Sequence, residues 1–440
     1  MHGDFSNITF SPDRNYSTVF DLQGRVGLDA NRNEQAAILL HRLRGALADL
    51  MGPYAGPAGP HLGFAVDNPS AADFTIGAGR YYVDGIGVES PAGTSYAGQP
   101  HAVMDLAGDD KLPRGRYLVY LKVWERHVTE VEAPWLHEPA LGLHHPDTSS
   151  RAQVVWQVRA VPVPAGDVSL ETWVQEWIDA AASMEHTGVL QVRARRPQEA
   201  DDDPCAAPSD AEYTGENQLY RVEIRSGGTA REGASFAWSR DNGSVIYPIL
   251  AGEGPVVQVS SLGRDRHTTL EIGQWVEIVD DAVSLRRELG LPRPAAPLRK
   301  VVDLDVDLST VTLDAPPPAT ERGRHPYLRR WDHTPPDRSP DGAVPVTEAS
   351  AARRDAGWIP LERGVEVRFL TGERGNPHRY RTGDYWVFPA RRTLGDVIWR
   401  HPQGSGPHGV AYHYAPLAVV QGDGVTGWRT SFALPLTRGL

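Results

Sequence analysis

Glycine and proline recur along this sequence often enough to exclude a purely helical protein. The 440 residues include 44 glycines and 36 prolines, almost a fifth of the chain, and both residues interrupt helices and favour turns. The fraction stays below the roughly 25–30% typical of low-complexity segments. Because 40% of the residues are hydrophobic, the chain can bury real cores. Many short strands joined by turns are therefore expected.

The length and charge narrow the class further. At roughly 150 residues per domain, the chain should form about three domains. A formal net charge of −12 gives no general basic surface for a phosphate backbone, so we expect no nucleic-acid partner. No apolar run approaches the ~18 residues of a membrane span, and the first residues lack the features of a secretory signal. With the single cysteine Cys205, which excludes an internal disulfide, these features predict a cytoplasmic protein.

The N-terminal residues are predicted to form an extended arm followed by a helix. Residues 1–28 show no helical periodicity. Asn31 and Glu34 have the spacing of a capping box, and Gly52 is a typical helix end. A helix of about 30 Å is therefore expected between them.

Apolar residues recur at helical spacing along one face of this helix: Ala36, Leu39, Leu40, Leu43, Leu47, Leu50 and Met51. Such a stripe must be covered by another apolar surface. Either it packs on the protein's own sheet, or the arm and the helix dock together on a neighbouring subunit. The residues expected to make the contact in the second case are Phe5, Phe10, Leu39, Leu43 and Leu47.

Period-two alternation after residue 63 predicts β-structure. Asp84-Gly85 lies between strand-forming residues and favours a type I′ hairpin, because both central residues of that turn need positive φ. Tyr117–Trp124 is apolar on both faces, as in a buried strand, and Gln153–Val161 is a further strand. We expect a β-sandwich module here.

The second half of the chain begins with a helix over roughly 170–184 and a polar stretch, 193–210, that is the best domain boundary. Asn242-Gly243 predicts a hairpin between 236–240 and 245–247. Residues 316–350 are rich in proline and arginine and are predicted to be loop.

The predicted fold is mainly β, with two or three sandwich or barrel modules, an N-terminal arm and helix, and a second helix between modules. Its predicted parts are 1–58, an extended arm plus amphipathic helix; 64–165, a β-sandwich module; 166–210, a helix and polar linker; 211–320, a second β-barrel-like module; and 321–440, a loop-rich C-terminal β region.

Histidines and carboxylates in two loops could supply metal ligands if the loops met in space. The candidates are His137, His144, His145, Asp147, His408 and His413. None has the i, i+4 spacing of a helical zinc motif, so turn residues are the better interpretation. Gly422–Gly427 has the spacing of a dinucleotide-binding loop, but no helix pattern follows it. We therefore expect no metal and no cofactor.

Carboxylates and tryptophans suggest an alternative chemistry. Glu125 and Glu132 lie near Trp124, and two carboxylates beside an aromatic ring are typical of glycoside hydrolases. Tryptophan faces also stack on sugar rings, and the candidate platform is Trp124, Trp135 and Trp156. These patterns leave open a carbohydrate-binding module and, as a further alternative, a glycoside hydrolase or metal-dependent enzyme.

Several long segments resemble an uncharacterised bacterial family whose genes lie in clusters for phage-tail-like contractile injection systems. The segments that carry the resemblance are 1–6, 23–31, 33–35, 123–129, 151–158, 216–224, 238–245, 383–391 and 413–418. They include Val123-Trp124-Glu125-Arg126-His127 and Trp238-Ser239-Arg240-Asp241-Asn242-Gly243. No catalytic residues come with the resemblance.

The resemblance implies a structural or adaptor component of a contractile injection system, in the baseplate or fibre region. Its partners would be other particle subunits, from baseplate, sheath or fibre, or a second copy of the chain. Assembly would take place in the cytoplasm, into a particle for release or for action at the cell surface. The β-rich composition agrees, since tail particles are built from β-modules joined by extended arms.

Overall fold

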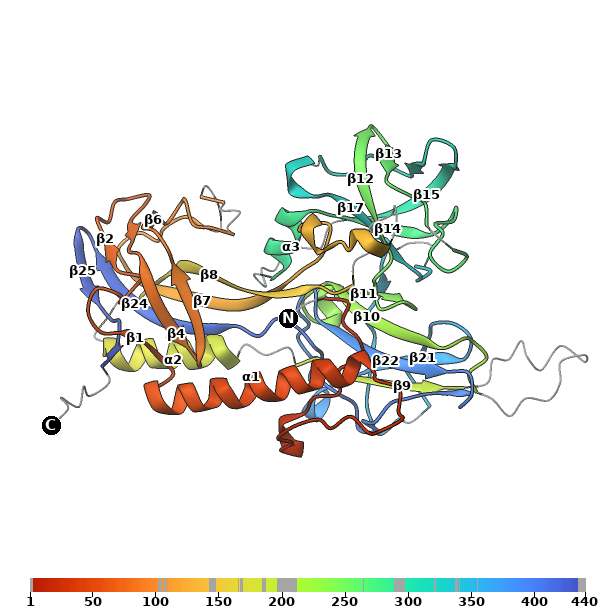
Figure 1. Cartoon of the computed structure of the whole chain (residues 1–440), viewed down its shortest axis with the longest axis horizontal. Helices are drawn as coiled ribbons and strands as arrows, with labels where there is room; N and C mark the ends of the chain where they lie inside the picture. Colours follow the sequence, from red (N-terminus) through yellow and green to blue (C-terminus); the bar gives the residue numbers. More distant parts are fainter. Residues whose placement is uncertain are drawn as a thin grey trace, which may run out of the picture.

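The structure is a computed structural model that describes the chain outside residues 1–2, 102–104, 107, 109, 142–147, 165, 167–168, 184–186, 196–211, 264, 289–296, 320–321, 337–338, 340, 354 and 434–440. The described residues form 26 strands and three α-helices, so the prediction of a mainly β fold is confirmed. Figure 1 shows three β bodies with one long helix running beneath two of them.

The first body combines the N-terminal strands with the last strands of the chain. Its strands are β1 (Tyr54–Pro57), β2 (Val66–Asp67), β3 (Thr75–Ile76), β4 (Gly79–Val83), β5 (Ile86–Ser90), β6 (Thr94–Ser95), β7 (Arg116–Val128), β8 (Arg151–Pro162), β24 (His413–Gln421), β25 (Gly424–Gly427) and β26 (Ser431–Phe432). They form sheets in the orders β26-β1-β4-β5, β2-β3-β6 and β25-β24-β7-β8. Phe64, Leu121 and Leu417 are among the side chains buried between them.

The second body is a sandwich of two sheets, β18-β11-β10-β22-β23 and β19-β21-β20 with β9 added to β21. Its strands are β9 (Leu190–Ala194), β10 (Gln218–Ser226), β11 (Ser235–Ser239), β18 (Val344–Pro345), β19 (Glu348–Ala349), β20 (Ile359–Pro360), β21 (Val365–Leu370), β22 (Tyr385–Arg391) and β23 (Asp396–Val397). Aromatic side chains fill its core, where Tyr220 stacks on Phe388 at 5.6 Å between ring centres.

The third body is a closed barrel in the order β12-β13-β16-β15-β14-β17. Its strands are β12 (Ile246–Glu253), β13 (Val256–Val259), β14 (Trp275–Val279), β15 (Leu298–Asp305), β16 (Thr310–Leu313) and β17 (Tyr327–Trp331), with the short helix α3 (Asp281–Glu288) after β14. Closure pairs every strand on both sides and leaves no open sheet edge. Val276, Val301 and Leu328 are buried inside the barrel.

The strand pairing differs from the predicted domain boundaries. The module predicted at 64–165 is completed by β24, which pairs with β7 from His413↔Val123 to Gln421↔Arg116. The predicted boundary after residue 320 cuts the barrel, because β17 closes it by pairing with β12 and β14. Part of the segment predicted to be loop, 316–350, is therefore a buried strand.

The turn at Asn242-Gly243 forms, but the predicted hairpin does not. Both residues have positive φ, 55° and 68°, as the sequence requires. The flanking strands do not pair with each other: β11 pairs with β10 and β18, whereas β12 pairs with β13 and β17. The turn instead leads the chain from the sandwich into the barrel. By contrast, β4 and β5 pair across Asp84-Gly85 as predicted.

Two long helices accompany the sheets. Helix α1 (Asp29–Met51) begins two residues before the predicted cap, and Leu28 at its N-cap makes no side-chain cap bond. The capping-box prediction at Asn31 and Glu34 is thus wrong, because Asn31 lies inside the helix. Glu34 accepts a hydrogen bond from Thr9 of the arm. Helix α2 (Leu170–Ser183) lies where predicted and packs Val174 and Ile178 on β7 and β24.

Short 3-10 turns complete the structure. They are η1 (Pro12–Arg14), η2 (Pro134–Leu136), η3 (Pro139–Leu141), η5 (Ala230–Glu232), η6 (Arg322–Arg324) and η7 (Glu373–Gly375).

Candidate functional site

Helix α1 turns its leucine stripe away from the protein. The exposed fractions of Leu39, Leu43 and Leu50 are 58%, 56% and 82%, whereas Ile38 on the opposite face is buried. On that inner face Arg44 binds Glu125 of β7 through two hydrogen bonds of 2.8 and 3.1 Å. The inward face of the helix is therefore small and partly polar, and the apolar stripe is the face left open.

The arm lies along the flank of this helix. The side-chain oxygen of Gln35 accepts hydrogen bonds from Val19 N at 2.7 Å and from Thr18 Oγ1 at 2.8 Å, and Arg42 donates to the carbonyl of Tyr16. Beyond these anchors the arm exposes large apolar side chains: Phe20, Leu22, Val26 and Leu28. We call these four residues, with Leu39, Leu40, Leu43 and Leu50 of α1, the docking surface.

The first described residues, however, are inserted into the protein's own body. The carbonyl of Gly3 accepts a hydrogen bond from Arg221 Nη1 at 2.7 Å, and that of Phe5 accepts one from Asn242 Nδ2 at 2.5 Å. The ring of Phe5 meets the edge of His127, with 4.7 Å between ring centres. Phe5, predicted to dock on a neighbouring subunit, therefore makes contacts within its own chain.

Of the other four predicted docking residues, two contact their own chain and two are open to solvent. Phe10 packs against His41, 5.6 Å between ring centres, and Leu47 is half-buried. Leu39 and Leu43 are the two of the five predicted docking residues that remain open to solvent. The start of the arm is an internal anchor, and its later part together with α1 forms the open surface.

Beneath the anchor lies a group of buried charges, the central charge cluster, which consists of Arg221, Glu223, Arg225, Glu277, Arg287 and Arg329. Arg221 Nε lies 2.7 Å from Glu223 Oε2 in the sandwich. Arg225 Nη1 lies 2.7 Å from Glu277 Oε2 in the barrel, so the cluster joins the two bodies. Burial lowers the pKa of Arg225 and of Arg287 to about 10, and both remain charged at neutral pH.

The predicted sugar platform does not form as a group. Trp124 is fully buried against Val155 and Val410. Trp156 is buried as well, and its Nε1 donates to the carbonyl of Glu89 at 3.1 Å. Trp135 alone of the three is open, with 80% of its surface exposed. Two of the three ring faces are therefore inaccessible to a sugar, because they belong to the core of the β7–β8 sheet.

The candidate metal ligands are dispersed or fall outside the described residues, as His144, His145 and Asp147 do. His413 pairs with Asp84, with 2.7 Å between Nδ1 and Oδ2, and His408 pairs in a β-bridge with Tyr385. His137 follows η2. Within the part of the chain that the structure describes, no three His, Cys, Asp or Glu side chains gather as a metal site.

The two carboxylates considered for hydrolysis each bind their own arginine. Burial raises the pKa of Glu125, but the hydrogen bonds and charge of Arg44 outweigh it, so the pKa lies below its ordinary value. Glu132 pairs with Arg126, and burial still raises its pKa. Each carboxylate thus has a structural partner.

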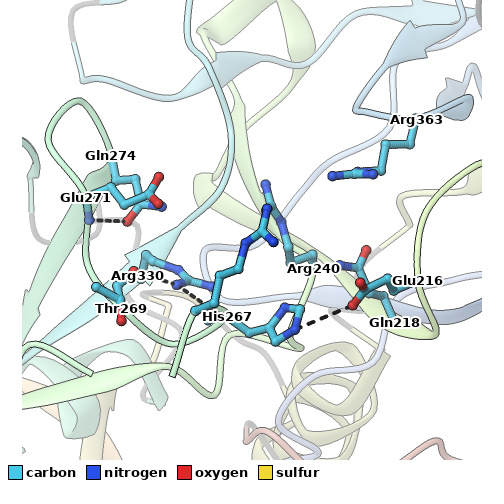
Figure 2. A pocket seen from close by; sticks show the side chains of 10 residues that line it. Glu216, Gln218, Arg240, His267, Thr269, Glu271, Gln274, Arg330 and Arg363 are labelled. Carbon is cyan, nitrogen blue, oxygen red and sulfur yellow. Dashed lines mark hydrogen bonds and ion pairs between the residues drawn. The ribbon is translucent and has the colours of Figure 1, made fainter. Parts of the chain in front are cut away.

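A polar pocket of about 360 Å³ lies between the sandwich and the barrel. Its walls are Glu216, Gln218, Arg240, Arg266, His267, Thr269, Glu271, Gln274, Arg330 and Arg363. Figure 2 shows the guanidinium groups of Arg240 and Arg363 facing each other across it, with His267 reaching toward Glu216. We call it the arginine pocket. Sequence reasoning missed it, because its residues come from five separate segments with no motif in common.

Comparisons with known proteins place the chain in a family. A family model described as a family of unknown function, DUF6519, matches residues 1–188 and 172–426. Because these matches cover most of the chain, the protein belongs to this family. Neither the comparison with curated proteins nor that with solved structures finds a match. Among the described helices, none is long and apolar enough to cross a membrane.

Proposed function

We propose that this DUF6519 protein is a structural or adaptor subunit of a phage-tail-like contractile injection particle, near the baseplate or fibre, and that it works by docking on another subunit. The observation that carries the proposal is the docking surface. Its leucines have the regular spacing of a packed helix face, yet more than half of Leu39 and of Leu43 is exposed. Contiguous exposed apolar surface of this kind marks interaction sites.

The body behind the docking surface suits a stiff connecting part. The central charge cluster joins sandwich and barrel, and the arm anchor reaches both Arg221 of the sandwich and His127 of β7 in the first body. Buried ion pairs require a defined geometry to offset the loss of hydration. Their placement between bodies therefore favours one fixed arrangement, in which the orientation of the docking surface is set.

The occupant we propose is an apolar surface on a different subunit of the particle. The resemblance of the sequence to a family encoded with contractile injection systems supports this choice. The net charge of −12 also disfavours self-association of free subunits, since like charges repel until a complementary partner is present.

The test is incorporation into particles. The double variant Leu39→Gln/Leu43→Gln should reduce the amount of the protein in purified particles at least tenfold while its circular dichroism and melting temperature stay unchanged. The matched control is Val306→Gln/Leu308→Gln, which changes two exposed apolar residues of the barrel. Equal incorporation of the two double variants and the native chain would contradict the proposal.

Light scattering separates the two kinds of partner. The isolated native chain should be a monomer at micromolar concentration. A dimer that the Leu39→Gln/Leu43→Gln variant dissociates would show that the surface joins two copies of this chain, and would overturn the choice of a different subunit.

A further inference from the structure

We propose that the start of the arm is an acid-sensitive latch, in which protonation of His127 weakens the insertion of the arm into the protein. The inserted residues are Gly3, Asp4 and Phe5, which we call the arm anchor. They bind Arg221 and Asn242 through backbone carbonyls and His127 through the Phe5 ring. The latch is separate from the exposed leucines of α1, so this inference goes beyond docking and does not depend on it.

The arm anchor covers the imidazole ring of His127. The rings of Phe5 and His127 meet edge to face, with 4.7 Å between their centres and 72° between their planes. The arm backbone is just as close, because a Cβ atom added to Gly3 would lie 2.7 Å from Nδ1 of His127 and closer still to the Phe5 ring. Only 8% of the His127 side chain is exposed. The arm therefore shields this ring from water.

The surroundings of the ring suit its neutral form. Nε2 of His127 is buried and makes no hydrogen bond to the described residues. On the other side of the ring, Asp4 Oδ1 lies 3.7 Å from Nδ1, which is too long for a hydrogen bond. A protonated imidazole has two N–H donors, and a charged group buried without acceptors is costly. Protonation therefore conflicts with the covered position of the ring.

Titratable and charged groups face the ring from the elements packed around it. They are Asp4 of the arm, Arg126 of β7, Glu132 of the loop after it, Arg221 of β10, Arg287 of α3, and Tyr327 and Arg329 of β17. Most of the charges are already paired: Glu132 with Arg126, Arg287 with Glu277, and both Arg221 and Arg329 with Glu223. Asp4 is the remaining acid of this set, and 35% of its side chain is exposed.

A small cavity beside the ring is closed on one side by the arm. Its volume is about 70 Å³, and its walls include Gly3 and Asp4 of the arm, His127, and Tyr327 and Arg329 of the barrel. Such a space holds a few water molecules at most, far fewer than surround a charged imidazole at the surface. When the arm leaves, the cavity opens and His127 is hydrated.

The proton and the arm therefore compete. Burial lowers the pKa of the anchored His127 below its ordinary value of 6.5; Asp4 opposes this shift, and the neighbouring arginines add to it. In the released state the ring regains water and its pKa moves back toward 6.5. As pH falls below 6.5, the released state takes up the proton first, so the balance shifts toward release by at most about tenfold per pH unit. Above this range the ring is neutral in both states, and the anchor holds.

The experiment is an NMR titration of the full chain labelled with ¹³C at Cε1 of histidine, with the His127 signal identified by its loss in His127→Gln. The native midpoint should lie below 6.5. Phe5→Ala uncovers the ring and should raise the midpoint by about half a pH unit or more. Because linkage is reciprocal, a shift of that size means that protonation weakens the Phe5 contact about threefold. The matched control is Phe10→Ala, which removes an arm ring packed on His41 and should leave His127 unchanged.

A second variant tests the latch without removing an apolar contact. Asp4→Asn should lower the His127 midpoint further, because the Asp4 carboxylate favours the charged ring. A native midpoint at or above 6.5, or an unchanged midpoint in Asp4→Asn or in a folded Phe5→Ala variant, would overturn the proposal. Leu39→Gln/Leu43→Gln should titrate as the native chain does, so failure of docking and failure of the latch are separable.

Discussion

The central charge cluster and the docking surface distribute residues in opposite and unusual ways. In the cluster, Glu223 and Glu277 are fully buried with arginines around them. On α1, Leu39 and Leu43 are mostly exposed. Folded proteins normally place leucines inside and charged residues outside. The burial of charge in the cluster and the exposure of leucine on α1 therefore need separate explanations.

The difference lies in where each region finds its partner. Every glutamate of the cluster has an arginine within the same chain, and the pairs cross from the sandwich to the barrel. The leucines of the docking surface find no such cover among the described residues. The comparison teaches that this fold pairs its buried glutamates with arginines of the same chain, whereas Leu39 and Leu43 of α1 stay exposed among the described residues.

The largest expected effect concerns the cluster. Glu277→Ala removes the partner of Arg225 and Arg287 and the acceptor of Trp331 Nε1, which lies 3.2 Å away. Leaving buried arginines unpaired should lower the free energy of unfolding by about 3–5 kcal/mol, measured by urea denaturation. Glu271→Ala, at an exposed glutamate in the loop that precedes β14, should leave the midpoint unchanged. A similarly small effect at both positions would show that the cluster does not stabilise the interior.

A buried histidine near the cluster provides a pH test of the same interior. His333 bonds the carbonyl of Gly342 at 2.6 Å, and burial lowers its pKa to about 4. The unfolded chain therefore takes up this proton first as pH falls, so stability should drop between about pH 6.5 and 4, by about 3 kcal/mol in total.

The His333→Gln variant should lose this part of the pH dependence, measured as unfolding free energy at pH 7, 5.5 and 4.5. If the native chain and the variant show parallel curves, His333 titrates as though exposed, and the interior is wetter than the structure indicates.

A smaller effect is expected at the arm anchor, which connects the two regions. Asn242→Gly removes the donor to the Phe5 carbonyl while keeping the positive φ. Stability should fall by about 1–2 kcal/mol, and amide exchange should accelerate at residues 3–10. Asn68→Gly, at an exposed asparagine with a φ of 52°, should not change exchange in the arm. Slow exchange in both variants would mean that other contacts hold the anchor.

The smallest effect is expected on the docking surface. Leu43→Gln should change the free energy of unfolding by no more than about 0.5 kcal/mol, because the side chain is exposed in the folded state too. Ile38→Ala, on the inner face of the same helix, should cost about 2–4 kcal/mol. The two losses of unfolding free energy are obtained from denaturant midpoints. Equal losses would mean that Leu43 is packed as Ile38 is, and would contradict its assignment to an open surface.

Local patterns in the sequence predicted much of the secondary structure. The strand predicted at Gln153–Val161 forms as part of β8, Arg151–Pro162, and Asp84-Gly85 indicated the β4–β5 turn. The helical spacing of the leucines was also correct. Which way that stripe faces could not follow from spacing, because the same period suits a core and an interface.

What sequence reasoning missed depends on partners far along the chain. Tyr327–Trp331 looked like solvated loop because it contains Arg329 and Arg330, yet it is a barrel strand. Arg329 finds Glu223 and Arg330 finds Asp241, and no local pattern records such pairs. The arginine pocket was hidden for the same reason, since Glu216, His267 and Arg363 meet only in the folded chain.

The position of β24 constrains how the chain matures. A strand from 413–421 lies between β25 and β7 in the first body, so that body stays incomplete until residue 421 has left the ribosome. Closing so long a loop is slow compared with local pairing, and the growing chain must carry an unfinished sheet edge during its synthesis. Nascent chains arrested before residue 413 should for this reason depend on chaperones, whereas the barrel can close earlier.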